Sequence, residues 1–151
     1  MADPHIRIFP HSQEEFTSID TLTTWLLTGL RARGGRYRLR SRNALAELPI
    51  GSIVLFRYGH KIVGEAIVAG YFRESSIDRT LAGEEFEYKA YVVFSQTSIR
   101  VYAPPIPIKI LQAILGDSLD ITKSAMPYYK IKDWTIYPRL LAEIVETGAF
   151  I

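Results

Sequence analysis

Residues 49–70, PIGSIVLFRYGHKIVGEAIVAG, constrain the fold of this chain more than any other stretch. Two apolar runs, residues 53–57 and residues 62–69, flank a short turn that contains Gly59, which is the pattern of a β-hairpin. Both faces of both strands are largely apolar, so we expect the hairpin inside a core. Gly64 and Ala66 carry almost no side chain on one face of the second strand. Another backbone or a flat ligand can therefore approach that face closely.

Glu65 is the one carboxylate in the second apolar run. Burial of an unpaired carboxylate costs roughly several kcal/mol, as it does for other ions taken out of water. Arg57 on the neighbouring strand is the expected partner. A contact between Glu65 and a ligand is the alternative.

The size and composition of the chain predict one domain spanning residues 1–151. With 151 residues and 48% hydrophobic content, it can bury one substantial core. The absence of cysteine excludes disulfides, thiolate metal sites and cysteine nucleophiles. No apolar run is long enough to span a bilayer, and the N-terminus lacks the pattern of a signal peptide. We therefore expect a soluble, cytoplasmic protein without a membrane partner.

The rest of the sequence predicts strands followed by helices. An amphipathic helix is expected over residues 19–30, with Thr17 or Ser18 as its N-cap and Trp25 on its apolar face. The other expected elements are a strand over residues 5–9, a helical turn over 43–48, a loop over 73–85, a strand over 86–96 paired with one over 99–102, helices over 108–115 and 136–146, and short pieces at Ile121 and 128–131. Residues 103–107, APPIP, are expected outside any sheet. This order predicts an α+β domain with a strongly curved or barrel-like sheet.

A basic strand follows Gly34-Gly35, and it lies within a segment of six arginines and no acidic residue. Alternation along a strand would place four of the arginines on one face: Arg36, Arg38, Arg40 and Arg42. Same-face residues repeat every ~6.6 to 6.8 Å, close to the spacing of phosphates along a nucleic-acid strand. Arginine also favours planar, bidentate recognition of anions. The alternative is a solvated edge strand whose cations prevent aggregation.

An ordered set of motifs resembles the PUA-like superfamily, most nearly its EVE and ASCH branches. The set consists of Arg42-Asn43, a short helical turn, the turn PIGS at 49–52, the strand IVLF at 53–56, and GEAIV at 64–68. Ser52 stands where the family commonly has aspartate, and the resembling run covers residues 36–80. The resemblance implies a PUA-like fold, with a curved mixed sheet or partly open β-barrel flanked by helices.

The resemblance also implies a nucleic-acid-binding module that draws a modified or flipped base into an aromatic pocket. It is similar to the reader domains that precede nuclease domains in modification-dependent restriction proteins, so DNA is favoured over RNA and a nuclease domain is a candidate partner, attached or associated. The resemblance implies a pocket-lining or structural role for Arg42 and Asn43, which match the Arg-Asn pair of the family. The predicted base pocket comprises Tyr37, Glu65, Phe72 and Tyr91. The predicted nucleic-acid contacts are Arg31, Arg33, Arg36, Arg38, Arg40, Arg42, Asn43 and Lys61.

Two other function classes compete with nucleic-acid binding. Glu87 and Lys89 match half of a metal-dependent nuclease core, but the second carboxylate is missing because Asp78 falls in the expected loop. The histidines lack metal-ligand spacing, and no nucleophile motif or phosphate loop is present. We therefore expect no catalysis, cofactor or metal in this chain. A protein-interaction module using residues 103–107 and exposed aromatic side chains is the second alternative.

Overall fold

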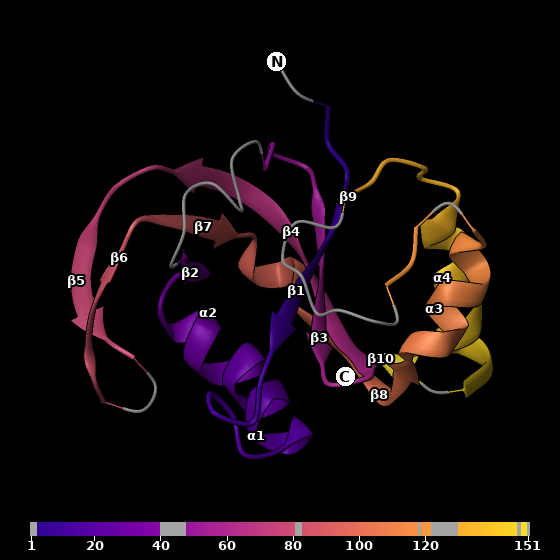
Figure 1. Cartoon of the computed structure of the whole chain (residues 1–151), viewed down its shortest axis with the longest axis horizontal. Coiled ribbons are helices and arrows are strands. Elements are labelled where there is room, and N and C mark those ends of the chain that lie inside the picture. The colour runs from indigo at the N-terminus through magenta and orange to yellow at the C-terminus, as the bar shows by residue number, and fades with distance from the viewer. Residues whose placement is uncertain are drawn as a thin grey trace.

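A strand-rich sheet and several short helices make up the computed structural model of the chain (Figure 1). It describes residues 3–39, 48–80, 83–117, 119–121, 130–147 and 149–150. The strands are β1 (Ile6–His11), β2 (Arg36–Leu39), β3 (Ile53–Tyr58), β4 (Lys61–Phe72), β5 (Ser76–Arg79), β6 (Glu85–Tyr88), β7 (Ala90–Phe94), β8 (Arg100–Pro107), β9 (Lys130–Ile131) and β10 (Ala149–Phe150). The helices are α1 (Ile19–Thr24), a π-helical turn (Trp25–Gly29), α2 (Leu30–Ala32), a 3₁₀ turn (Gln96–Ser98), α3 (Ile108–Leu115) and α4 (Ile136–Thr147).

The main sheet is mixed and branched. Its longest path runs β10-β8-β4-β3-β1-β9, while β7 pairs with both β4 and β2. The pairing of β1 with β3 is parallel, and the other pairings are antiparallel. The predicted α+β class is confirmed. Within the described residues, however, the sheet is not closed into a barrel.

The predicted core hairpin is confirmed as β3 and β4, which are joined through Gly59. β4 continues to Phe72 because its second half pairs with β7 after the first half pairs with β3 and β8. The close approach predicted at Gly64 is made by the backbone of β8. A Cβ atom on Gly64 would lie 2.4 Å from the carbonyl oxygen of Arg100.

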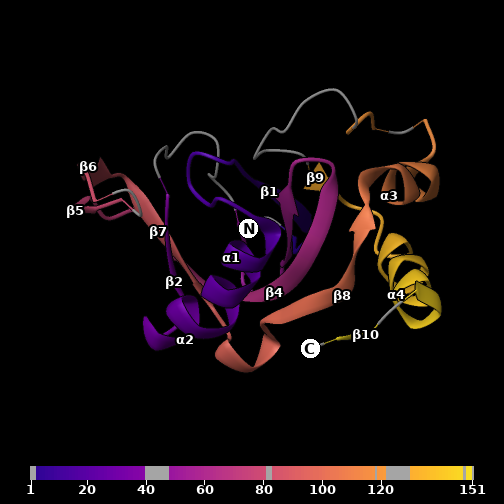
Figure 2. The same ribbon diagram turned by 90° about the horizontal axis from the view of Figure 1, so that it is seen from below.

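Side-chain alternation in the central strands creates two apolar cores on opposite faces of the sheet. Val54 and Phe56 face the core that is covered by α1, the π-helical turn and α2. Ile53 and Leu55 face the core beside α3 and α4. Figure 2 shows these two groups of helices separated by the strands.

The predicted amphipathic helix is confirmed, although it runs to Ala32 through the π-helical turn. Ser18 is its N-cap, and its hydroxyl accepts a hydrogen bond from the backbone N–H of Thr21 at 3.1 Å. Trp25 packs against the first core, as predicted.

Three predictions about the later strands are wrong. The expected loop over residues 73–85 contains β5 and leads to β6, and together they form a hairpin that we call the β5–β6 arm. The side chains of SIDR and EFEY alternate between the two faces, so these segments can pair as strands although their composition is polar. The strand expected over residues 99–102 pairs with β4 instead of the preceding strand. The prolines of residues 103–107 lie inside β8. Pro104 and Pro105 fall where the register of β8 and β4 shifts, between the pairs Gly64–Val101 and Ile62–Ile106, and Pro107 is the last residue of the strand.

The strand expected over residues 86–96 is divided into β6, which pairs with β5, and β7, which pairs with β2 and β4. The other elements agree with the sequence or cannot be compared with it. The helix over 108–115 is α3 and is followed by Gly116 at φ 65°, while the last predicted helix is α4. Most of the helical turn predicted over 43–48 lies outside the described residues. Among the residues that are described, no helix has the length and apolar character needed to cross a membrane.

Candidate nucleic-acid interface

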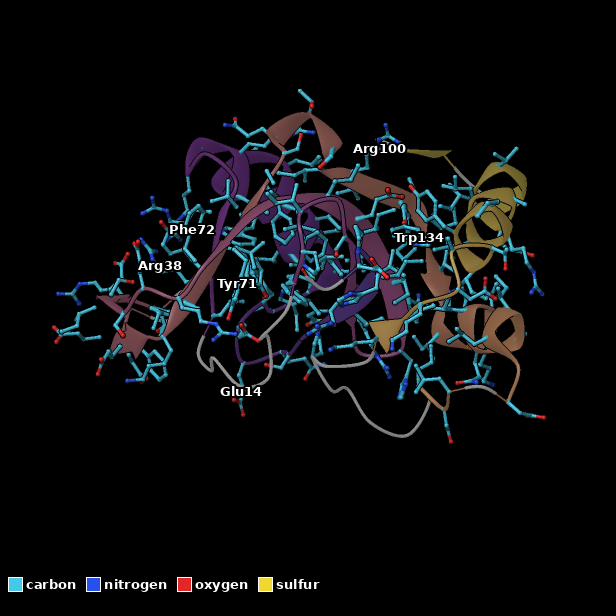
Figure 3. The ribbon with its side chains drawn as sticks, turned by 90° about the horizontal axis from the view of Figure 1, so that it is seen from above. Glu14, Arg38, Tyr71, Phe72, Arg100 and Trp134 are labelled. Atoms are coloured by element: carbon cyan, nitrogen blue, oxygen red, sulfur yellow. The ribbon has the colours of Figure 1, made fainter. Side chains whose placement is uncertain are left out.

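Four of the predicted site residues share one face of the strands β2, β7 and β4. In the register of these strands, Arg38 is paired with Tyr91, and Tyr91 with Phe72. Arg36 lies two residues before Arg38 and therefore projects to the same side. We call the surface formed by Arg36, Arg38, Phe72 and Tyr91 the arginine-aromatic face. Figure 3 shows Arg38 and Phe72 close together at the end of the molecule that carries the β5–β6 arm.

Tyr91 lies at the centre of the arginine-aromatic face. The guanidinium carbon of Arg36 is 4.5 Å from the centroid of the Tyr91 ring, within the range of a cation–π contact. The ring of Phe72 is stacked on Tyr91, with 4.9 Å between centroids and an interplanar angle of 25°. Because β2 and β4 flank β7 on opposite sides, Arg36 and Phe72 approach Tyr91 from opposite sides.

Asp78 of the β5–β6 arm binds two of the predicted arginines. One oxygen of its carboxylate pairs with Arg38 and lies 3.8 Å from the guanidinium of Arg33. Arg38 also lies over the ring of Tyr88, at 5.9 Å. The arm therefore supplies an anion between the guanidinium groups of Arg33 and Arg38, beside the arginine-aromatic face. Sequence reasoning missed this role because it assigned Asp78 to a loop.

The other predicted nucleic-acid contacts lie apart from this face or outside the described residues. Arg31 donates a hydrogen bond to the carbonyl oxygen of Ile99 at 2.8 Å. Lys61 is exposed at the opposite end of β4 from Phe72, about 35 Å away along the strand. The remaining three, Arg40, Arg42 and Asn43, lie outside the described residues.

Tyr37, predicted in the base pocket, points to the other side of β2 and packs in the first core. Its ring lies 5.3 Å from that of Phe9, and its hydroxyl is 2.6 Å from Nε2 of His11. Nδ1 of His11 lies 3.2 Å from the carbonyl oxygen of Arg57. A neutral ring satisfies both contacts if Nδ1–H donates to the carbonyl and Nε2 accepts from Tyr37. Burial lowers the pKa of His11 to about 4, against partial opposition from its backbone hydrogen bonds.

The buried His11 should make folding stability depend on pH. Its pKa is lower in the folded than in the unfolded protein, so the unfolded state binds the proton first as pH falls. Stability is therefore lost as pH decreases from about 6.5 toward 4, by about 2 kcal/mol between pH 7 and pH 5. Urea denaturation at several pH values would measure this loss. In a His11→Gln variant the slope over that interval should be clearly smaller; an unchanged slope would contradict the assignment.

Glu65, also predicted in the base pocket, is buried on the side of the sheet that faces α4. Its carboxylate accepts hydrogen bonds from the hydroxyls of Tyr102, at 2.8 Å, and Tyr137. The predicted partner Arg57 instead donates to the carbonyl oxygens of Gly59 and Ile121. Burial, followed by the nearby Glu65 carboxylate, raises the pKa of Tyr102. The two hydroxyls satisfy the buried charge and connect α4 to β4 and β8.

The geometry does not support the nuclease alternative. Glu87 and Lys89 form an exposed ion pair with each other at 3.2 Å. Asp78 lies on strand β5, where it pairs with Phe86, whereas Glu87 pairs with Ile77. The carboxylates of Asp78 and Glu87 therefore project to opposite faces of the arm. In the described part of the chain, no three histidine or acidic residues are grouped to hold a metal ion.

Comparison of the chain with protein-family models, curated proteins and solved structures finds no match. The candidate site therefore rests on its own geometry. Of the four residues predicted for the base pocket, Phe72 and Tyr91 lie together, whereas Tyr37 and Glu65 lie in the two cores.

Proposed function

We propose that this protein binds nucleic acid through the arginine-aromatic face. The observation that carries the proposal is the row Arg38, Tyr91 and Phe72 across three neighbouring strands, with Arg36 over the central ring. Guanidinium groups bind phosphate oxygens in a planar, often bidentate geometry. Aromatic rings beside them offer a stacking surface for bases, which is the combination used for single-stranded and unpaired nucleotides.

The PUA-like resemblance extends this proposal to a modified base in DNA, read after it leaves the helical stack. Phe72 and Tyr91 supply aromatic surface for such a base, and the arginines supply contacts for the backbone around it. Under this form of the proposal, a nuclease domain attached to or associated with the chain would act on the DNA that the module selects.

Fluorescence anisotropy at low salt would test the proposal directly. The probes are matched duplexes and single strands of DNA and RNA, each unmodified or carrying a methylated or other modified base. Binding whose affinity falls steeply with salt would support phosphate contacts, and preference for one modified base would support the reader form. Failure to bind any probe would overturn the proposed function and favour the protein-interaction alternative.

Removal of the Asp78 charge should strengthen nucleic-acid binding. Asp78 pairs with Arg38 and approaches Arg33, so its carboxylate competes with a phosphate for these guanidiniums. We expect Asp78→Asn, which nearly preserves the side-chain shape, to raise affinity about threefold to tenfold in low-salt anisotropy titrations. Asp117→Asn removes the same charge from an exposed position after α3 and is the matched control. Equal effects of both substitutions would show that only net charge matters.

A further inference from the structure

The two aromatic rings of the arginine-aromatic face differ in how accessible they are. Tyr91 has Arg36 on the side of β2 and Phe72 on the side of β4, and its hydroxyl lies 3.4 Å from a carboxylate oxygen of Glu74. Phe72 lies at the margin of this stack and is 42% exposed. The Phe72 ring is exposed whereas Tyr91 is half-buried, so Phe72 presents the larger aromatic surface to a ligand.

Gly70 allows Phe72 to adopt this position, because a glycine leaves the space that the Phe72 ring occupies. A Cβ atom on Gly70 would lie 2.9 Å from Cε2 and 3.2 Å from Cζ of Phe72. The absence of a side chain thus lets the Phe72 ring lie across the strand and against Tyr91. Gly70 is a positioning residue for the exposed ring.

These contacts place the more accessible ring on the same face as the guanidinium groups of Arg36 and Arg38, with Tyr91 between them. A base inside a continuous duplex has both faces covered by its neighbours, and it must leave the stack before it can contact an external ring. A base in a single strand is free to stack without that cost, and stacking tolerates any base because each has a π-face.

We propose that the preferred ligand of the arginine-aromatic face is single-stranded nucleic acid, with one unpaired base stacked on Phe72 and adjacent phosphates bound by Arg36 and Arg38. This inference rests on the proposed function and specifies its ligand class. Phe72 sets the preference for single strands. The arginines contribute affinity for any nucleic-acid backbone.

The test compares a single-stranded 12-mer with the duplex of the same sequence, by anisotropy at one low salt concentration. The wild-type protein is expected to bind the single strand at least about tenfold more tightly. Phe72→Ala should remove about tenfold of single-strand affinity, at the scale of one base stack, and leave duplex affinity nearly unchanged. Phe72→Trp should retain the preference, and quenching of the added tryptophan's fluorescence would report the stack.

Gly70→Ala provides a second variant that changes neither charge nor the aromatic residue. By displacing the Phe72 ring, it should reduce the single-strand preference while the protein remains folded by circular dichroism. The inference would be overturned if the wild-type protein bound single strand and duplex equally, or if Phe72→Ala reduced both affinities by the same factor. Either result would leave the proposed function standing. Absence of binding to both would overturn the proposed function itself.

Discussion

Replacing Arg36 and Arg38 together by alanine is expected to weaken nucleic-acid binding about 10- to 100-fold at low salt. Each arginine that contacts a phosphate releases about one counterion when the complex forms. Loss of two contacts should therefore reduce the slope of log affinity against log salt by about 1.4 to 1.8. Because phosphate contacts carry no sequence information, the loss should be similar for all sequences. Anisotropy titrations at four or more salt concentrations would measure both effects.

A double variant with the same charge change tests whether position matters. Lys109 and Lys132 are exposed on α3 and after β9, away from the strands that form the arginine-aromatic face. Their replacement by alanine removes two positive charges and should change affinity by less than about threefold, the scale of long-range, screened charge effects. If this control weakened binding as much as the arginine substitutions, the arginine-aromatic face would not be the binding surface.

Gly64→Ala should destabilise the fold by about 3 kcal/mol or more, the upper range for overpacking of a close contact. The added Cβ would meet the backbone carbonyl of Arg100 at 2.4 Å, and a backbone atom inside a paired strand cannot move as a flexible side chain can. β8 would have to separate from β4, which also carries the pairing with β3. Urea denaturation monitored by circular dichroism would give the change in the free energy of unfolding.

Gly59→Ala separates this contact from the general effect of adding a methyl group to a glycine. Beyond the adjacent residues of the chain, no atom lies within 4 Å of the Cβ that this substitution adds, and the left-handed backbone, with φ 58°, opposes it. The expected cost is therefore about 1 to 2 kcal/mol. A Gly64→Ala variant as stable as Gly59→Ala would show that β8 does not approach β4 this closely.

Local patterns predicted the elements whose stability comes from neighbours in the sequence. The apolar runs around Gly59 gave the β3–β4 hairpin, and helical spacing after Ser18 gave α1 with its cap. Alternation in residues 36–39 correctly placed Arg36 and Arg38 on one face of the strand. These features depend on periodicity and turn chemistry, which a sequence displays directly.

Contacts between distant segments could not be read from the same patterns. Tyr137 is 72 residues from Glu65, and no periodic signal connects them. The β5–β6 arm was missed because polar composition was given more weight than the alternation of SIDR and EFEY around Gly83. The sequence of residues 103–107 does not predict that its prolines lie in a sheet. Their place in β8 depends on a shift of register against the partner strand β4, which the segment itself does not specify.

The shared strand β4 determines how the protein opens. Its first half is hydrogen-bonded between β3 and β8, and its second half pairs with β7, which carries Tyr91. Amide protons of a strand held in this way exchange with solvent only when several neighbours separate together. We therefore expect slow deuterium exchange to continue along β4 toward Phe72. The ring proposed to receive a base would then be anchored to a strand that opens slowly.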